Sequence, residues 1–293
     1  MGRGNSYSLR IVFSLLSSIG LNLASSAEEA PERVIEFTEV TQYLRQSHLG
    51  REILGELARH QKGERKIRFA RGSISRTDSL LTRAYHQSTG EEVREREVTL
   101  ILKQQGSLHE IALDLAHELV HALREPMWDP YDPGLTLSQY VDRTILGPGG
   151  EAEALLFECQ LAQELSASFG DALPKRCSFT VDLYSKQAFS LLGREFYKIG
   201  GWMPWITKVW PHSSRDNVAK KFLDQSPTLY SATGGAPYPV SIAREYLELT
   251  KSACKNVRRR LSSSRSPASH ATKELDFLDR RCSDLGQNKA DFE

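Results

Sequence analysis

The stretch that decides the fold runs from Ser107 to His121 and reads SLHEIALDLAHELVH. Ser107 stands three residues before Glu110 and directly ahead of an apolar periodic run, which is the pattern of a capping box at the start of a helix. Residues four apart lie on one face of a helix, so His117 and His121 point in the same direction. The sequence therefore predicts a helix that presents two neighbouring imidazoles, with Glu118 beside them.

The spacing His-Glu-x-x-His is typical of a zinc site. Two imidazoles four residues apart can bind one Zn²⁺, and the Glu after the first His then lies beside the metal. The metal lowers the pKa of its bound water, and the Glu takes the proton of that water before it attacks a carbonyl group. We expect His117 and His121 to be zinc ligands and Glu118 to be the general base. The competing interpretation is two surface histidines on a structural helix.

This motif, with a predicted strand before it and a Glu-bearing helix after it, resembles the gluzincin class of zinc metallopeptidases over about residues 98–168. The resemblance implies a third zinc ligand from a Glu on the following helix, and Glu151, which opens the sequence EAEA, matches that position. Leu155 stands where the class often has Asn or Asp. The resemblance also implies hydrolysis of a peptide bond in a protein or peptide substrate.

Charge and helix geometry also favour Glu151 as the third zinc ligand. Two neutral imidazoles leave Zn²⁺ uncompensated, so a carboxylate is the expected third ligand. The break at residues 147–150 lets the chain reverse and place a second helix beside the first. On that helix Glu158 shares the stripe of Glu151, whereas Glu153 points about 200° away. We expect Glu158 to orient a ligand imidazole, and Glu153 and Glu158 stay open as substitute ligands.

Other catalytic classes lack their sequence patterns. The chain has no Gly-x-Ser-x-Gly nucleophile elbow, and residues 147–150 lack the Lys-Ser or Lys-Thr of a phosphate-binding loop. No Gly and His follow His121 at the spacing of the metzincins. The group that stabilises the oxyanion stays open among Tyr131, His212 and Tyr230, because no spacing rule selects one of them.

Residues 1–27 are typical of a secretory signal peptide. Arg3 and Arg10 flank the start of an apolar run at residues 11–24, and small residues ending at Ala27 suit cleavage. The run is shorter than the roughly 20 apolar residues that a membrane span requires, which disfavours an uncleaved anchor. We expect export to the periplasm or the extracellular space, without stable membrane insertion of the mature chain.

The net charge of the chain gives no reason to expect binding to nucleic acid or to a membrane surface. Loss of residues 1–27 removes two arginines and no acidic residue, so the formal charge moves from +1 to −1. A near-neutral chain is not expected to bind nucleic acid or a membrane surface by charge. The run Arg258 to Arg260 indicates a solvated helix end, where the helix dipole favours cations.

Four cysteines occur, all after residue 27, and an even number in an exported chain predicts two disulfides. Three pairings are possible. Closure of the shorter loops favours Cys159 with Cys177 and Cys254 with Cys282. Four buried free thiols are the alternative.

The predicted fold is α+β and predominantly helical, with C-terminal helices beside the two site helices. Amphipathic helices are expected within residues 36–61, broken near Gly50. Residues 127–150 hold many prolines and glycines and are expected to be mostly irregular. Short strands that form a small antiparallel sheet are expected at residues 66–70, 82–86 and 98–102.

The C-terminal half is expected to continue with helices after a short aromatic segment. The helices are predicted at residues 180–198, 217–224, 240–261 and 272–283, with a proline-bearing aromatic segment at 202–210. Residues 28–240 are assigned to a catalytic domain, and residues 241–293 to a C-terminal helical extension. The function predicted is an exported zinc metallopeptidase-like hydrolase. The alternative is an exported helical binding protein without turnover, with a vestigial or chance motif.

Overall fold

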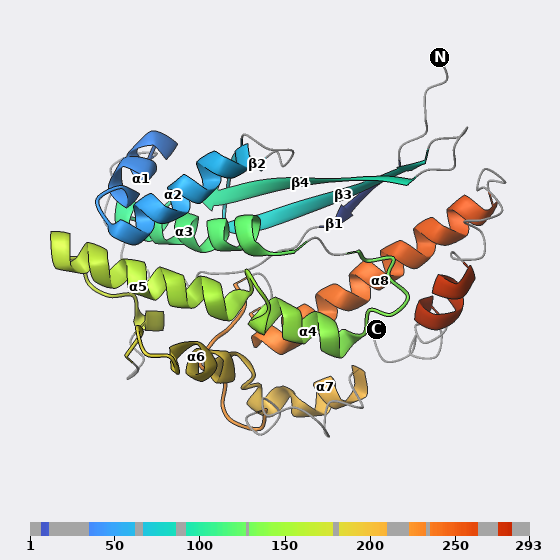
Figure 1. Ribbon diagram of the computed structural model, residues 1–293. Helices are drawn as coiled ribbons and strands as arrows, with labels where there is room; N and C mark the ends of the chain where they lie inside the picture. Colours follow the sequence, from blue (N-terminus) through green and yellow to red (C-terminus); the bar gives the residue numbers. More distant parts are fainter. Residues whose placement is uncertain are drawn as a thin grey trace, which may run out of the picture.

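The fold places a sheet, a central helix and further helices in successive layers (Figure 1). The computed structural model describes residues 7–11, 35–61, 67–85, 92–126, 129–177, 182–209, 223–232, 235–262 and 275–282. The chain is α+β and mostly helical, as predicted. Helix α3 (Leu108–Arg124) lies between the sheet and helix α5 (Glu151–Phe169), so the motif residues stand at the middle of the molecule.

The sheet is mixed. Its strands are β1 (Tyr7–Ile11), β2 (Ile67–Gly72), β3 (Arg76–Tyr85) and β4 (Glu92–Lys103), in the order β1-β3-β4-β2. β4 pairs antiparallel with β3 but parallel with β2, so the prediction of an antiparallel sheet is wrong at β2. β2 and β3 run in opposite directions, and β4 inserts between them, where it must be parallel to one of its neighbours. Val98, Leu100 and Leu102 alternate along β4 and are buried in the same core cluster as the apolar residues of α3.

Strand β1 lies within the predicted signal peptide. It pairs antiparallel with β3, with Tyr7 opposite Arg83 and Ile11 opposite Ser79. The expected cleavage site at Ala27 lies outside the described residues, so the signal peptide stays a prediction. Cleavage at that site would remove β1 and leave β3 at the edge of the sheet.

Two helices, α1 (Phe37–Leu44) and α2 (His48–Gln61), pack against α3. The predicted break between them falls at residues 45–47, and Gly50 lies inside α2. A Cβ atom on Gly50 would lie 1.9 Å from the carbonyl oxygen of Leu44. The glycine therefore does not end a helix here but lets α2 start close against the end of α1.

Helix α3 begins as the sequence predicts. The Ser107 hydroxyl accepts the Glu110 N–H at 3.2 Å, and the Glu110 carboxylate accepts the Ser107 N–H at 2.9 Å, which is a complete capping box. All residues from Ile111 to Leu123 are buried, between the sheet on one side and α5 on the other. On a helix that is buried on all sides, each polar side chain needs a hydrogen-bond or charge partner within the protein. The buried polar residues of α3 therefore have their partners on the neighbouring elements.

The expectation of an irregular connection at residues 127–150 is wrong over its second half. Helix α4 (Leu137–Leu146) forms there, opened by a capping box between Thr136 and Gln139. Its apolar face buries Tyr140 and other side chains in the core. The prolines and glycines of this region flank the helix rather than interrupt it.

The region after α5 holds shorter helices than predicted. Helix α6 (Ala188–Phe196) covers the second half of the predicted helix at 180–198. Helix α7 (Met203–Val209) occupies the aromatic segment, with Pro204 in its first turn, where a missing N–H costs nothing. The helix expected at 217–224 lies almost entirely outside the described residues.

Helix α8 (Tyr238–Ser262) confirms the long C-terminal helix, and a short helical segment at residues 275–282 confirms the last one. The first turns of α8 lie in the main core, where Val240 and Ala243 are buried. Among the described residues, no helix has the length and apolar character needed to cross a membrane.

Both disulfides form with the favoured pairing, Cys159–Cys177 and Cys254–Cys282, and no free cysteine remains among the described residues. We expect the purified, oxidised protein to show no titratable thiols after denaturation without reductant. Addition of a reductant should release four thiols, one for each cysteine of the chain. Thiol titration checks this expectation, and thiols in the unreduced sample would contradict it.

Candidate metal centre

Three predicted ligands meet at the interface of α3 and α5. The Oε2 atom of Glu151 lies 3.5 Å from His117 Nε2 and 4.0 Å from His121 Nε2. One ligand atom from each residue falls within 4.8 Å of the others, and all three residues are buried. Glu151 reaches this place because it is the first residue of α5, whose N-terminus faces the middle of α3. The structure therefore brings together a group that could hold a metal ion.

The glycine-rich turn before α5 positions His121. Gly149 has a φ of 67°, and a Cβ atom on it would lie 2.3 Å from the backbone nitrogen of Glu125. Only glycine allows so close an approach in this conformation. The turn thereby brings the Gly149 carbonyl to 2.6 Å from His121 Nδ1, which donates to it. This hydrogen bond leaves His121 Nε2 for the centre of the site.

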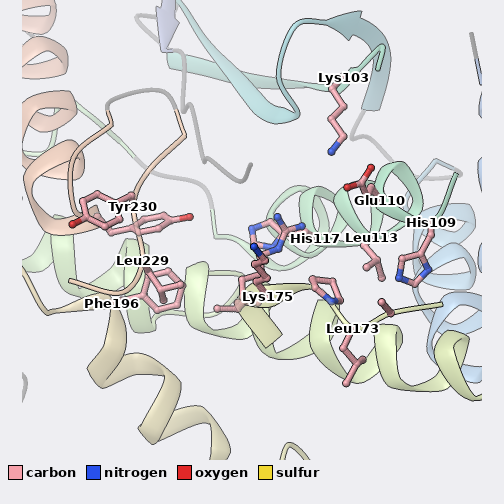
Figure 2. A pocket seen from close by; sticks show the side chains of 15 residues that line it. Lys103, His109, Glu110, Leu113, His117, Leu173, Lys175, Phe196, Leu229 and Tyr230 are labelled. Carbon is pink, nitrogen blue, oxygen red and sulfur yellow. The ribbon is translucent and has the colours of Figure 1, made fainter. Parts of the chain in front are cut away.

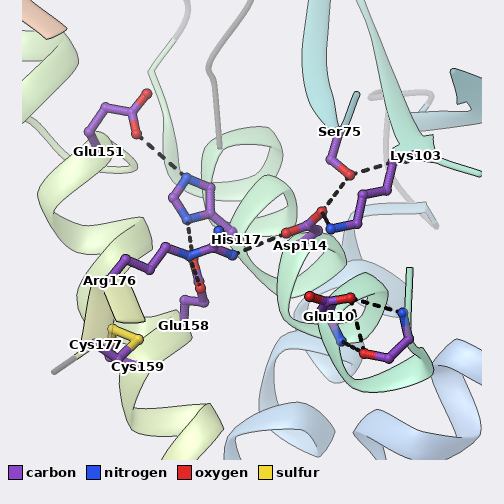
Figure 3. Close-up of polar contacts among 11 residues, drawn as sticks. Ser75, Lys103, Glu110, Asp114, His117, Glu151, Glu158, Cys159, Arg176 and Cys177 are labelled. Carbon is purple, nitrogen blue, oxygen red and sulfur yellow. Dashed lines mark hydrogen bonds and ion pairs between the residues drawn. A yellow bond between two sulfur atoms is a disulfide. The ribbon is translucent and has the colours of Figure 1, made fainter. Parts of the chain in front are cut away.

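Glu158 positions the other imidazole. Its Oε2 atom lies 3.0 Å from His117 Nδ1, and both side chains are buried (Figure 3). The predicted role of Glu158 beside a ligand imidazole agrees with this contact. Neither Nε2 atom, of His117 or of His121, has a hydrogen-bond partner among the described residues. Two buried nitrogens directed at a carboxylate fit a metal ion, because each would otherwise stay unsatisfied.

The electrostatics of the site favour a cation. Burial lowers the pKa of His117, but the carboxylates of Glu151 and Glu158 outweigh it and raise this pKa to about 10. Burial and the adjacent His117 hold the pKa of His121 well below its ordinary value. His121 is therefore a neutral imidazole, the form that binds metals. The raised pKa of His117 places a positive charge on that imidazole, beside the carboxylates of Glu151 and Glu158. A metal ion bound at His117 Nε2 would replace that proton and supply positive charge in the same place.

Glu118 is buried beside the ligands and is held by the sheet. Its Oε2 atom accepts a hydrogen bond of 2.7 Å from the Thr77 hydroxyl on β3, whereas its Oε1 atom has no hydrogen-bond partner among the described residues. Burial raises the pKa of Glu118 to about 8, although His117 and Thr77 oppose the rise. A carboxyl group with this pKa can both take up and release a proton near neutral pH.

Glu153 turns away from the site, as the helix geometry predicts. Its carboxylate accepts a hydrogen bond from Arg124 at 2.9 Å and from the Gly149 N–H at 2.7 Å. It therefore supports the turn that holds His121 rather than facing the ligand atoms. Of the three candidate carboxylates, Glu151 alone points at both Nε2 atoms, and Glu158 lies behind His117.

A cavity of about 530 Å³ opens beside His117 (Figure 2). Tyr230, one of the three candidates for stabilising the oxyanion, lines this cavity. Tyr131 does not; its hydroxyl contacts Asn256 at 3.3 Å, on α8. His212 lies outside the described residues. The buried Tyr238 also lines the cavity, and nothing in its sequence context pointed to it.

Two further residues contact the site from parts of the chain that contain no recognisable motif. Thr77 and Arg176 reach the site only through the packing of β3 and of the segment after α5. One signal could have located Arg176: the favoured disulfide joins the residues that follow Arg176 and Glu158, so it places these two side by side.

Comparison with protein-family models, with curated proteins and with solved structures finds no match for this chain.

Proposed function

We propose that the protein is an exported, zinc-dependent hydrolase of peptide bonds, of the gluzincin type. One observation carries the proposal: the ligand atoms of His117, His121 and Glu151 lie within 4.8 Å of one another, beside a buried Glu118. Two imidazole nitrogens and one carboxylate oxygen are the protein ligands of a common class of catalytic zinc sites, which keeps a further position for water or substrate.

His117, His121 and Glu151 would hold the zinc ion, which would lower the pKa of a bound water and polarise the carbonyl group of the substrate. The chain supplies the proton transfers. Thr77 fixes one oxygen of the Glu118 carboxylate, and the other oxygen accepts the proton of the attacking water. Glu118 then returns this proton to the leaving amine, which completes hydrolysis of the peptide bond.

The substrate in this proposal is a protein or peptide that enters the cavity beside His117. A volume of about 530 Å³ lies in the range of ligand sites and accommodates a short peptide segment. Tyr230 lines this cavity and carries a hydroxyl that can donate a hydrogen bond to an oxyanion. We assign no role to nucleic acid or to a membrane surface, in keeping with the balanced charge of the chain.

The two disulfides support an exported location, because disulfides form and persist in oxidising compartments. The second candidate, a binding protein without turnover, would not need a general base. The buried Glu118, held by Thr77, favours the enzyme. Cleavage of an unfolded protein substrate by the zinc-loaded parent, compared with Glu118→Gln, tests the proposal: equal rates, or no cleavage by the parent, would contradict it.

A further inference from the structure

Arg176 connects the candidate metal centre to a neighbouring charge cluster (Figure 3). It lies on the short helix η1 (Lys175–Cys177), after the end of α5. Its Nε atom donates to Glu158 at 2.5 Å, and a terminal nitrogen of its guanidinium donates to Asp114 at 3.1 Å. The other oxygen of Glu158 contacts His117. A direct path of contacts therefore runs from Arg176 through Glu158 to a ligand imidazole.

The two carboxylates need this guanidinium because both are wholly buried. Asp114 and Glu158 each have 0% exposure. Asp114 has a second cation, Lys103, at 3.2 Å, whereas the ion pairs of Glu158 among the described residues are those with His117 and Arg176. An unpaired buried charge is costly, so a Glu158 carboxylate that loses its guanidinium partner is expected to turn away from its present position. That movement would weaken its contact with His117.

A disulfide fixes Arg176 in this place. Cys177 follows Arg176 and Cys159 follows Glu158, so the Cys159–Cys177 disulfide joins η1 to α5 directly beside the ion pair. Residues 170–174, which connect α5 to η1, contain no helix or strand. Without the covalent link, η1 would be held to α5 mainly by side-chain contacts. The link lowers the conformational entropy lost when Arg176 is positioned.

We propose that Arg176 is a positioning residue for the metal centre and that the Cys159–Cys177 disulfide is required to keep it in place. This inference rests on the proposed function, since it assumes that the site binds zinc. It makes metal affinity depend on oxidation of one particular disulfide. The reduced chain, before export, would bind zinc weakly, and the site would reach full affinity only in an oxidising compartment.

The chain offers a matched control at its other disulfide. Arg281 also precedes a bonded cysteine, Cys282, whose partner is Cys254 on α8. Arg281 is buried and donates to Thr250 at 2.8 Å and to the Leu135 carbonyl. None of these contacts includes a candidate ligand or Glu158. Changes at this second pair therefore report the general effect of losing an arginine contact or a disulfide.

The experiment measures the zinc affinity of the full chain by competition with a chelator. One variant is Arg176→Lys, which keeps the positive charge but loses the planar guanidinium group whose nitrogens contact both Glu158 and Asp114. The other is Cys159→Ala with Cys177→Ala. Each should bind zinc roughly 10- to 100-fold more weakly, the usual effect of changing a residue that orients a ligand.

The corresponding controls are Arg281→Lys and Cys254→Ala with Cys282→Ala, and their zinc affinities should stay within about 3-fold of the parent, because distant sites act independently. Combination of Arg176→Lys with loss of Cys159 and Cys177 should weaken zinc binding no more than the loss of the disulfide alone. This non-additivity is expected because both changes break the same path.

Two results would overturn the inference while leaving the proposed function intact. The first is a zinc affinity equal to that of the parent in both Arg176→Lys and the variant without Cys159 and Cys177. The second is an equal loss in the variants of the two disulfides, which would indicate a general effect on stability. If the disulfide variant does not fold, Arg176→Lys against Arg281→Lys decides. A parent that binds no zinc would overturn the proposed function and this inference with it.

Discussion

Replacement of Glu118 by glutamine should abolish peptide hydrolysis while zinc stays bound. The amide has nearly the shape of the carboxyl group and can still accept the hydrogen bond from Thr77, so the fold and the ligands should be preserved. It cannot take a proton from water. General acid–base catalysis contributes about 10²- to 10⁴-fold, so we expect kcat to fall by at least about 100-fold.

Zinc content and the rate of peptide hydrolysis have to be measured on the same samples of Glu118→Gln and of the parent. Glu52→Gln, an exposed acidic residue on α2, is the matched control and should keep the rate of the parent. Equal cleavage by Glu118→Gln and the parent would show that another group acts as the base. Cleavage lost together with zinc would show that Glu118 acts on the metal site itself, which the proposed mechanism does not allow.

The second large effect is expected on zinc affinity when Glu151 becomes glutamine. The carboxylate is the candidate ligand that carries a negative charge, and it lies 3.5 Å from His117 Nε2 and 4.0 Å from His121 Nε2. Loss of this charge should weaken zinc binding by more than the roughly 10- to 100-fold that changes around a ligand cause. Chelator competition on folded protein measures the effect.

Two neighbours on the same helix provide the comparison. Glu158→Gln should have an intermediate effect, because it contacts His117 without facing Nε2. Glu153→Gln should change zinc affinity least, since its carboxylate contacts Arg124 and the Gly149 N–H. A larger loss for Glu153→Gln than for Glu151→Gln would move the third ligand to Glu153 and contradict the orientation of α5.

The site was predictable from the sequence wherever the information is local. A capping box and a four-residue spacing define where α3 starts and which way His117 and His121 point. Helix periodicity likewise separates Glu151 from Glu153. These features depend on contacts within one or two turns, so a single sequence contains them.

The features that the sequence did not reveal depend on packing between distant segments. Thr77 reaches Glu118 across 41 positions, and Arg176 reaches Asp114 across 62. The parallel pairing of β2 follows from which strand takes the centre of the sheet, and strand composition alone does not show this. Helix α4 is a different case, because its capping box at Thr136 and Gln139 is a local signal that the sequence contains, although prolines and glycines lie on both sides of the helix.

The most direct test of the metal centre is the zinc content of the purified full chain, with and without His117→Ala. We expect about one zinc per chain in the parent and almost none in the variant, because a site of three protein ligands loses one of them. His48→Ala, which changes an exposed histidine on α2, should keep the zinc of the parent. The same zinc content in the parent and in His117→Ala, or no zinc in the parent, would contradict the account.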